Sequence, residues 1–542
     1  MKRPQYLSYI LSDAHRWWKP GSLVFISAHP GAGKTTFILR VLLKYAIDTR
    51  KEILYLSNRE ILHKQILREV CKIFDIPFEY FEDEKFAEFP GITLTTYQTI
   101  AERLSTDQYY SNIAFYNYVV MDESHFFVED SDFNAKIQRL LRWRERIQCD
   151  VEIYISATID DVLIEFGYWN TEWKTIYEDD VLEVRERIAH DIIRNLKGET
   201  ELLFYYHISP EFPSFNIFVY DDIRDVIEVI NNDETEEKWI LFQSNKETAK
   251  RITAKNLKHA SVVITADDKE SNAMGEIIEN QHFKAKVLIT TKVLDNGVSL
   301  CDDKIKNILI ETTSRTEFIQ MMGRRRLGND EDVTLNLYIP RLHDRYFKSM
   351  IIRRIQPLLD LTVLSHNALL TIAMDSDAGY KSVKALFDAR EGRLILNPLA
   401  EKRLNEKKKY FEKLSKKIEI DPNYFVKEQL AWLGIKDYTK IVFVTEMKFQ
   451  SKLKELIDYL GAMAERELTK KQQSLFRTEI KVFVQELLPE KLSNNSRVPG
   501  ITVINDCLEA LEVPYRVKSF SGKRKGDETI WKIIKHGPAI SA

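Results

Sequence analysis

Cysteine is scarce in this chain, since only four of its 542 residues are cysteines and no two of them form a C-x-x-C pair. Cys71, Cys149, Cys301 and Cys507 lie so far apart that neither a disulfide framework nor a zinc knuckle is indicated. Such thiols are typical of a reducing compartment, and we expect a cytoplasmic protein. The 18 glycines and 15 prolines make up about 6% of the chain, against about 12% in average proteins, which excludes collagen-like and low-complexity classes.

Long apolar runs and an excess of one charge are also absent. No run of 18 apolar residues occurs, and acidic and aromatic residues interrupt the N-terminal stretch where a signal peptide needs continuous apolar residues. We therefore expect no membrane partner. The 79 Lys and Arg residues against 82 Asp and Glu residues give a formal net charge of -3. A chain with this balance meets a polyanion only through a local basic patch.

The order of apolar segments predicts an α/β protein. From about residue 21 to 160, short apolar runs alternate with longer amphipathic stretches, and the same rhythm recurs up to about residue 345. This alternation is typical of strands joined by helical crossovers, so we expect two tandem parallel-sheet domains. Beyond Pro340 the apolar residues recur at three- and four-residue spacing, which predicts a mainly helical C-terminal region.

Shifts in this pattern divide the chain into five expected segments. They are a first α/β domain at 1–165, a connecting segment at 166–215, a second α/β domain at 216–345, a helical region at 346–440 and a C-terminal accessory domain at 441–542. In the helical region we expect Leu404, Phe411, Leu414 and Ile418 to form one apolar stripe, with the lysines between them on a solvated face. The last segment ends in a small module of one helix and a β-hairpin.

A phosphate-binding loop is indicated directly after the apolar run LVFIS. The sequence AHPGAGKT (28–35) fits A/G-x-x-x-x-G-K-T and precedes an amphipathic stretch, so it joins a strand to a helix N-terminus. Backbone N–H groups and the helix dipole attract phosphate there, the lysine reaches the terminal phosphates, and the Thr35 hydroxyl is suited to Mg²⁺. The expected nucleotide-binding residues are His29, Pro30, Gly31, Ala32, Gly33, Lys34, Thr35 and Thr36.

A pair of carboxylates follows the next buried strand, YNYVVM. A nucleotide site needs one carboxylate beside Mg²⁺ and a second to polarise the attacking water, and adjacent positions at a strand end can direct them differently. We assign Asp122 to Mg²⁺ and Glu123 to the general base. A polar strand end without catalytic function is the alternative, which the phosphate loop upstream makes less attractive.

These segments resemble, in order, the motifs of DExH-type helicases of superfamily two. The phosphate loop, DESH (122–125) and SAT (156–158) are similar to the first three signatures of that family. LYLSNRE (54–60) resembles motif Ia, TTYQTI (95–100) the neighbouring nucleic-acid contact and LFQSNKE (241–247) motif IV. LITTKVLDNGVSL (288–300) is similar to motif V and FIQMMGRRR (318–326) to motif VI. The resemblance covers about residues 20 to 345 and not the rest.

The resemblance implies two RecA-like domains that clamp ATP with Mg²⁺, with nucleic acid lying across their top. It implies that Gln320 helps to order the attacking water and that Arg324 and Arg326 neutralise charge on the γ-phosphate. The common spacing would put the second arginine where Leu327 stands, so the choice of arginine finger among Arg324, Arg325 and Arg326 stays open.

Further roles follow from the same resemblance. Gly297 is an expected nucleotide contact, and the expected coupling residues are His125, Ser156, Thr158 and Asp295. Polar residues at strand ends of both halves are expected to hold phosphate oxygens without reading bases, although any single one also fits ordinary helix capping. They are Ser57, Asn58, Arg59, Thr96, Gln98, Ser244, Lys246, Thr290 and Thr291. Gln5, Trp17 and Trp18 stand where relatives contact the base, but the tryptophans equally fit a core.

The sequence therefore predicts an ATP-hydrolysing, nucleic-acid-dependent helicase or translocase that acts on DNA or RNA, with DNA favoured. The alternative is a nucleic-acid-stimulated ATPase switch with little unwinding activity in a larger antiviral-defence or mobile-element complex. In that case a protein partner binds through the C-terminal third. Seven basic residues against two acidic ones between Tyr515 and Lys535, with Phe520 and Trp531 interleaved, fit either a nucleic-acid contact or a docking surface.

Overall fold

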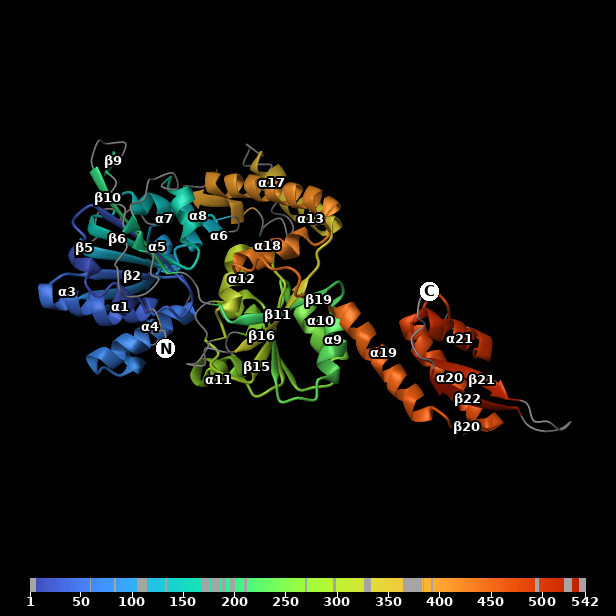
Figure 1. Cartoon of the computed structure of the whole chain (residues 1–542). Coiled ribbons are helices and arrows are strands. Elements are labelled where there is room, and N and C mark those ends of the chain that lie inside the picture. Colours follow the sequence, from blue (N-terminus) through green and yellow to red (C-terminus); the bar gives the residue numbers. More distant parts are fainter. Residues whose placement is uncertain are drawn as a thin grey trace. The chain divides into compact units, whose positions relative to one another are not determined.

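The chain is described here by a computed structural model (Figure 1). The described residues are 6–58, 60–81, 84–104, 115–131, 134–167, 175–176, 186–187, 192–194, 200–208, 212–268, 271–295, 299–325, 333–363, 383, 385–390, 393–492, 497–520 and 529–535. Within these ranges, no helix combines the length and the apolar character that crossing a lipid bilayer requires.

The first sheet forms the centre of lobe 1 (residues 6–208). In order across the sheet, its strands are β3 (Phe86–Phe89), β4 (Ile92–Thr96), β2 (Ile53–Ser57), β5 (Tyr116–Asp122), β6 (Cys149–Ser156), β1 (Ser22–Ala28), β10 (Thr200–Ile208), β8 (Glu186–Arg187) and β7 (Thr175–Ile176), and β9 (Ile192–Arg194) pairs with β10. From β4 to β10 neighbouring strands run parallel, whereas β3 is antiparallel to β4. The carboxyl ends of the parallel strands therefore meet at one edge, which is where functional loops gather in such sheets.

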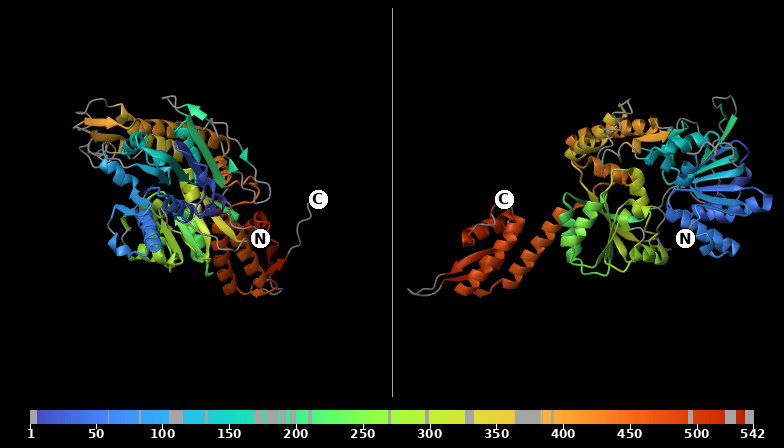
Figure 2. Two further views of the ribbon diagram at one scale, coloured as in Figure 1. Left: turned by 90° about the vertical axis from the view of Figure 1, so that its left-hand side faces the viewer. Right: turned by 180° about the vertical axis from the view of Figure 1, so that it is seen from behind.

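Helices cover both faces of this sheet (Figure 2). They are α1 (Leu7–Ile10), η1 (Ala14–Arg16), α2 (Lys34–Phe37), η2 (Ile38–Leu42), α3 (Leu43–Thr49), α4 (Glu60–Phe74), η3 (Phe78–Tyr80), α5 (Tyr97–Arg103), α6 (Phe126–Glu129), α7 (Ile137–Arg144) and α8 (Ile159–Glu165). Val24 and Ile26 of β1 pack into one core with α2 to α4, while Leu23 and Phe25 pack into another with α5 to α8. All residues of β1 are buried, as expected of a strand between two helical layers.

The second sheet forms the centre of lobe 2 (residues 214–340, completed by the short strand Ile441–Phe443). Its order is β13 (Ser261–Ile264), β14 (Val287–Thr290), β12 (Lys238–Phe242), β15 (Ile305–Ile310), β16 (Thr334–Pro340), β11 (Ser214–Tyr220) and β19 (Ile441–Phe443). The pairs from β13 to β16 are parallel. The helices associated with this sheet are α9 (Ile223–Asn232), α10 (Lys246–Asn256), η5 (Ala266–Asp268), α11 (Asn272–Asn280), η6 (Lys292–Asp295) and α12 (Arg315–Met322). Two tandem RecA-like sheets are thus present, which confirms the predicted fold class.

One strand departs from the sequence-based expectation. Residues 166–215 are expected to connect the two sheet domains, but Thr200–Ile208 forms β10, which lies parallel to β1 in lobe 1. Leu203 and Phe204 are buried in the two cores of that lobe. The apolar run ELLFYYHI has the composition of a strand, but its partner strand lies about 180 residues away, so local pattern does not assign it to a sheet.

The helical region (residues 344–434) follows lobe 2. Its elements are α13 (Asp344–Met350), η7 (Ile351–Ile355), α14 (Gln356–Thr362), β17 (Phe387–Arg390), β18 (Arg393–Leu396), α17 (Pro398–Ile420) and α18 (Tyr424–Trp432). The stripe of Leu404, Phe411, Leu414 and Ile418 is buried in one core, as predicted, and packs with Phe347 of α13. The lysines between these positions are mostly exposed.

This helical region contacts both lobes. Arg139 of α7 makes a two-pronged ion pair with Asp388 of β17, and both side chains are buried. The Asn397 side chain donates to the Ser131 backbone oxygen at 3.2 Å. Toward lobe 2, Gln429 of α18 donates to the Thr312 backbone oxygen at 3.1 Å. The region therefore bridges the two sheet domains.

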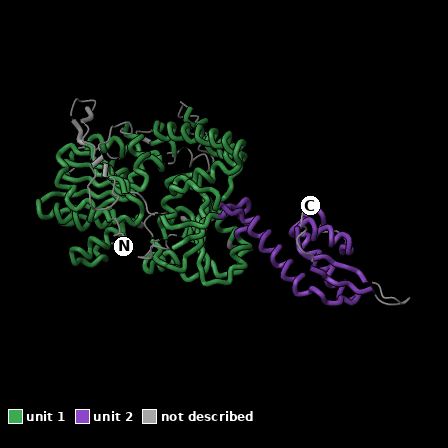
Figure 3. The backbone as a smooth tube through the Cα atoms, in the orientation of Figure 1, with its two compact units in different colours: residues 1–217, 227–440 green, residues 218–226, 441–542 purple. Residues whose placement is uncertain are grey.

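The chain divides into two compact units (Figure 3). The first comprises residues 1–217 and 227–440, and the second residues 218–226 and 441–542. The later elements of the second unit are α19 (Val444–Met463), β20 (Glu467–Leu468), α20 (Lys470–Leu487), α21 (Ile501–Ala510), β21 (Tyr515–Phe520) and β22 (Ile530–Lys535). Strands β20, β22 and β21 form an antiparallel sheet whose inner residues Val517 and Ile533 pack with the three helices. The predicted terminal helix and hairpin are α21, β21 and β22.

Candidate active site

The phosphate-binding loop lies between β1 and the helix that begins with α2. Gly31 and Gly33 have φ values of 95° and 78°, which other residues rarely adopt, so the two glycines allow the loop to turn. The helix begins at Lys34 and continues through η2 and α3 to Thr49, so its dipole and first N–H groups face the loop. The other predicted loop residues are the buried Ala32, the partly buried His29, Pro30 and Thr35, and the exposed Thr36.

Asp122 is oriented by two buried tyrosines at the end of β5. The Tyr55 hydroxyl donates to Asp122 Oδ2 at 2.5 Å, and the Tyr97 hydroxyl donates to the Asp122 backbone oxygen at 2.9 Å. Burial raises the pKa of Asp122 and the neighbouring Glu123 raises it further, while Lys34 opposes both effects. Neither tyrosine was foreseen, because in sequence both look like ordinary core residues of a strand and a helix.

The residues at this strand end fit Mg²⁺ held together with a phosphate group. Mg²⁺ commonly binds one or two carboxylates and takes its other ligands from phosphate oxygens and water. Among the described residues, no group of three or more His, Cys, Asp or Glu side chains forms a cage for a metal ion. Asp122 is buried and Thr35 lies in the first turn of the helix after the phosphate loop, so these two side chains suit a cation that arrives with its phosphate.

Glu123 is held next to the lysine of the phosphate loop. Lys34 Nζ donates to Glu123 Oε1 at 2.9 Å, and His125 Nδ1 lies 3.4 Å from Glu123 Oε2. Burial raises the pKa of Glu123, but Lys34, His125 and Arg324 together lower it below its usual range, so the carboxylate stays ionised. Its φ is +50°, a strained value for a side-chain-bearing residue, and this turn separates the Glu123 side chain from that of Asp122.

The two lobes meet through a chain of buried hydrogen bonds. Gln320 Nε2 of α12 lies 3.0 Å from His125 Nε2, and His125 Nδ1 lies 3.0 Å from Ser156 Oγ at the end of β6. With the Gln320 amide donating, the neutral imidazole carries its hydrogen on Nδ1. The Ser156 hydroxyl also accepts the Thr158 backbone N–H at 3.1 Å. Four residues that were predicted separately are therefore connected.

A second set of contacts between the lobes was not predicted. Thr316 of α12 donates its hydroxyl hydrogen to Thr158 Oγ1 at 3.1 Å, and the partly exposed Arg315 lies 3.5 Å from Asp160. Gly323, at the end of α12, lies against the Pro30 ring of the phosphate loop. In sequence these residues flank the recognised motifs but carry no signal of their own, because their partners lie more than 150 residues away.

Two of the three clustered arginines fall in the described part of the chain, and they differ in surroundings. Arg324 is buried and lies close enough to Glu123 to lower the pKa of that carboxyl. The Arg325 side chain is fully buried and lies 3.4 Å from Asp303 of its own lobe. Of these two arginines, Arg324 is therefore the one whose charge acts on Glu123 beside the phosphate loop. Arg326 lies outside the described residues.

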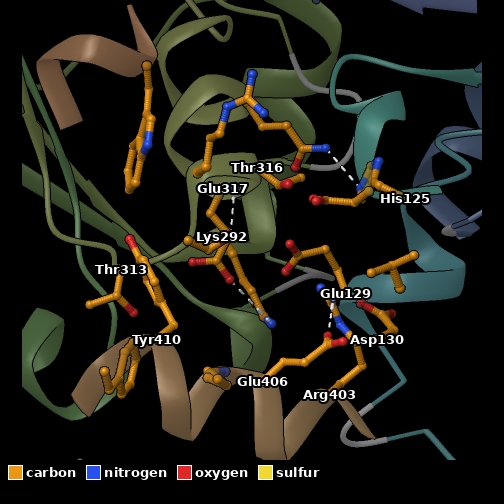
Figure 4. A pocket seen from close by; sticks show the side chains of 18 of the residues that line it. His125, Glu129, Asp130, Lys292, Thr313, Thr316, Glu317, Arg403, Glu406 and Tyr410 are labelled. Carbon is orange, nitrogen blue, oxygen red and sulfur yellow. Dashed lines mark hydrogen bonds and ion pairs between the residues drawn. The ribbon is translucent and has the colours of Figure 1, made fainter. Parts of the chain in front are cut away.

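A cavity of about 560 Å³ lies beside this junction, between both lobes and α17 (Figure 4). Its walls carry the carboxylates of Glu129, Asp130, Asp161, Glu317, Glu406 and Glu428, and the cations of Lys292, Arg315, Arg403 and Lys407. Since acids outnumber bases, the cavity is a poor site for a triphosphate, which supports placing the nucleotide at the phosphate loop.

One carboxyl of this cavity has an unusual acidity. Burial, together with the nearby carboxylates of Glu317 and Asp161, raises the pKa of Glu129 to about 7, although Arg403 and Lys407 oppose the rise. Glu129 is the last residue of α6, which begins directly after the DESH box. The carboxyl is thus close to its titration point near neutral pH.

Several of the predicted nucleic-acid contacts already make hydrogen bonds or ion pairs within the protein. Ser57 and Thr290 are fully buried and donate to the backbone oxygens of Thr95 and Ile264, so bonds to the neighbouring strands account for their hydroxyls. Thr96 caps α5. Ser244 donates to Glu311, and Lys246 pairs with Asp267 at the surface.

Asn58 differs from these. Its side chain is 2% exposed and lines the cavity, its Oδ1 has no hydrogen-bond partner among the described residues, and its backbone oxygen accepts from Gln98. Among the predicted contacts, Asn58 and the partly buried Thr291 are therefore the two whose polar side chains are least accounted for by bonds within the protein. Arg59 and Gly297 lie outside the described residues, and of Asp295 the structure describes only the backbone, at the end of η6.

The residues expected near the base separate into two groups. Trp18 is 5% exposed and donates its ring N–H to the Tyr206 hydroxyl, so it belongs to the core, whereas Trp17 is 71% exposed. Gln5 lies outside the described residues. Tyr6 was not predicted, yet its ring would lie 3.4 Å from a Cβ at Gly33, directly on the phosphate loop.

Comparison with known proteins finds one family model that matches part of lobe 1. Residues 12–166 match the family model of the DEAD/DEAH box helicase. A stretch of 107 residues is 34% identical to the genome polyprotein of Tembusu virus, and it covers 19% of this chain but only 3% of that polyprotein. Similar solved structures include S. cerevisiae Dbp5 bound to RNA and ADP BeF3, with 15% identity and a TM-score of 0.40 over 62% of this chain and 87% of that chain. Another is Mss116p bound to ssRNA and AMP-PNP, with 13% identity and a TM-score of 0.42 over 78% and 90%.

Proposed function

We propose that this chain is a helicase of superfamily two that hydrolyses ATP to move along or unwind a nucleic acid, because its residues 12–166 match the DEAD/DEAH box helicase family model. Members of this family hydrolyse ATP, generally with Mg²⁺. The nucleic-acid dependence, the directed movement and the role of each side chain are our proposal. The observation that carries it is the juxtaposition of Lys34, Glu123 and Arg324 at the meeting point of two lobes.

The phosphate loop binds the triphosphate in this proposal. The N–H groups around Gly31 and Gly33 and the helix N-terminus hold the β- and γ-phosphates, and Lys34 neutralises them. Thr35 and Asp122 would hold Mg²⁺, which would supply positive charge beside the phosphates. When Lys34 turns to phosphate, the ion pair with Glu123 weakens and leaves that carboxylate able to accept a proton from water.

The second lobe completes the catalytic site. Glu123 acts as the general base, Gln320 helps to orient the water, and Arg324 stabilises the charge that develops on the transferred phosphoryl group. Since Gln320 and Arg324 lie on α12 and directly after it, they reach the phosphates only when the lobes are close together. Hydrolysis is thereby tied to the closure of the cleft.

The buried contacts between lobes transmit this closure. His125 joins Glu123 to Ser156 on its own lobe and to Gln320 on the other, and Thr158 contacts Thr316. When the γ-phosphate leaves, its attraction to Arg324 of lobe 2 is lost, so the closed arrangement of the two lobes is no longer favoured and they separate. Repeated closure and opening would shift the grip of the two lobes on a bound strand.

The strand is proposed to lie near Thr291 and Gln98, whereas the buried Asn58 faces the acid-rich cavity and accepts a hydrogen bond from Gln98 through its backbone oxygen. Contacts of this kind hold the backbone without reading bases, so we expect no sequence preference. The two solved relatives were captured with RNA, while the notion that this chain prefers DNA rests on its sequence alone. Both polymers therefore belong in the first experiment.

ATP turnover with and without nucleic acid tests the proposal. We would measure hydrolysis with single- and double-stranded DNA and RNA at one stated salt concentration, because phosphate-driven binding weakens steeply with salt. Lys34→Ala is expected to abolish turnover, and Glu123→Gln to lower kcat about 100-fold or more while ATP still binds. Lys136→Ala, which removes an exposed cation of the same lobe, is the matched control.

The outcomes separate the competing readings. Full turnover in Lys34→Ala or Glu123→Gln would overturn the site assignment. Stimulated hydrolysis without strand displacement, together with a protein that co-purifies through residues 441–542, would favour the ATPase switch instead. Turnover that no nucleic acid stimulates would contradict both.

A further inference from the structure

The antiparallel sheet of the second unit packs one face on the helices and turns its other face away from them, as far as the described residues show. Because side chains alternate along a strand, Val517 and Ile533 point to the helices, and their neighbours point away. We call the outward residues Arg516, Lys518, Phe520, Ile530, Lys532 and Ile534 the outer face. Arg516, Lys518 and Phe520 are exposed, and the other three are partly exposed.

This face holds two cations directly opposite one another. Lys518 of β21 pairs in register with Lys532 of β22, so their Cβ atoms stand about 5 Å apart. Like charges directly opposite one another destabilise a sheet. Since the two lysines lie on the face turned away from the helices, core packing does not explain why they are there. Lys532 is partly compensated by Glu467 at 2.9 Å, but Lys518 has no ion-pair partner in the described part of the chain. The pair is suited to an anion that can accept hydrogen bonds from both ammonium groups.

An aromatic ring lies next to the two lysines. Phe520 is 46% exposed, stands opposite Ile530, and has the Lys532 ammonium 6.0 Å from its ring centroid. An exposed aromatic ring next to lysine ammonium groups is a combination that binds single-stranded nucleic acid, because bases stack on the ring while the cations contact backbone phosphates. An acidic protein surface would use the lysines but gain less from the ring.

We propose that the outer face binds single-stranded nucleic acid, with a base stacked on Phe520 and a backbone phosphate held by Lys518 and Lys532. The inference rests on the proposed function, because it supplies a second contact for the same polymer. The face lies in a unit separate from the ATP site, so it adds affinity without taking part in hydrolysis. Its contacts are to one base plane and to phosphate, and binding is therefore indifferent to sequence.

Anisotropy of fluorescein-labelled 20-mers of deoxythymidine and of uridine, with the full chain and no nucleotide, tests this site. We expect Phe520→Ala to weaken binding about 5-fold or more, since stacking contributes about 1–3 kcal/mol per base. Lys518→Glu should weaken binding and reduce the slope of log affinity against log salt by about 1. The controls are Leu475→Ala, an exposed apolar residue of α20, and Lys454→Glu, an exposed lysine of α19.

The failure of this site and of the proposed function can be told apart. Wild-type affinity in both outer-face variants, in a chain whose hydrolysis nucleic acid still stimulates, overturns the outer face alone. Loss with Lys518→Glu but not with Phe520→Ala points to a general anion surface and overturns the stacking proposal. If the wild type neither binds the 20-mers nor responds to them in hydrolysis, the proposed function fails. ATPase without nucleic acid should be unchanged in both variants, which also reports that the chain is folded.

Discussion

Gly323 of lobe 2 and Pro30 of lobe 1 lie in direct contact, and the contact leaves no room for a side chain on the glycine. A Cβ at position 323 would stand 2.5 Å from Pro30 Cγ and 2.6 Å from Pro30 Cβ, far inside van der Waals distance. The φ of Gly323 is -74°, so any residue could adopt its backbone conformation. The glycine is therefore needed for the approach of α12 to the phosphate loop.

Replacing this glycine should impair closure of the lobes. In Gly323→Ala, the added methyl group would overpack the contact with Pro30 and destabilise the closed state by about 1–3 kcal/mol. This corresponds to roughly a 5- to 100-fold loss in kcat/KM for ATP. Steady-state hydrolysis measures it. Gly275→Ala in α11 is the matched control, because a Cβ there meets no atom within 4 Å. Equal activity of the two variants would show that the contact with Pro30 does not limit turnover.

Alanine substitutions at Arg324 and Arg325 should affect turnover and stability differently. Arg324→Ala removes the guanidinium near Glu123, so kcat is expected to fall about 1,000-fold, as for other arginine fingers, with little change in stability. Arg325→Ala removes a fully buried side chain from lobe 2 and should lower the thermal midpoint more than kcat. Turnover and thermal unfolding of both variants give the comparison. The reverse pattern would assign the finger to Arg325.

Glu129 should make stability depend on pH. Its pKa is raised to about 7 by burial and by the nearby carboxylates Glu317 and Asp161. In the unfolded chain it ionises near pH 4.5, so the folded state loses stability as pH rises from about 4.5 to 7, and the loss is constant above. This rise in pKa corresponds to a loss of about 3 kcal/mol in the free energy of unfolding, or about 2 kcal/mol after allowance for the partial exposure of the side chain.

Thermal unfolding of Glu129→Gln tests this expectation. Glutamine has no charge to bury, so the variant should be more stable than the wild type at pH 8 and equal to it at pH 4.5. Glu406→Gln, which neutralises an exposed carboxylate of the same cavity, serves as the control. A stabilisation by Glu129→Gln that is the same at both pH values would argue against the raised pKa.

The Arg139 and Asp388 pair should be a main attachment of the helical region to lobe 1. Arg139→Ala leaves a buried carboxylate without a partner, which costs about 3–5 kcal/mol, so a large drop in the thermal midpoint is expected. Replacing both residues, with Arg139→Met and Asp388→Leu, should restore much of that loss because no charge stays buried. Lys136→Ala breaks only the exposed pair with Glu102 and should change stability by less than about 1 kcal/mol. A single variant as stable as the wild type would mean that this pair does not anchor the region.

Several parts of the fold and site could be read from the amino-acid order because their causes are local. The turn through Gly31 and Gly33, the following helix start and the carboxylates after a buried strand each lie within a few residues. The alternation of buried strands with amphipathic helices predicted both sheets for the same reason. The apolar stripe of α17 was readable from helical periodicity alone.

The sequence by itself thus determined the loop, the carboxylates and the order of two sheet domains, since these depend on neighbours along the chain. Tertiary structure alone decided that β10 pairs with β1, that Tyr55 and Tyr97 orient Asp122, and that Ser57 and Thr290 are occupied with backbone oxygens. It also distinguished Arg324 from Arg325 and brought Gly323 against Pro30. The physical reason is that a side chain's partner and burial depend on strand order and on contacts across hundreds of residues, which short-range pattern does not encode.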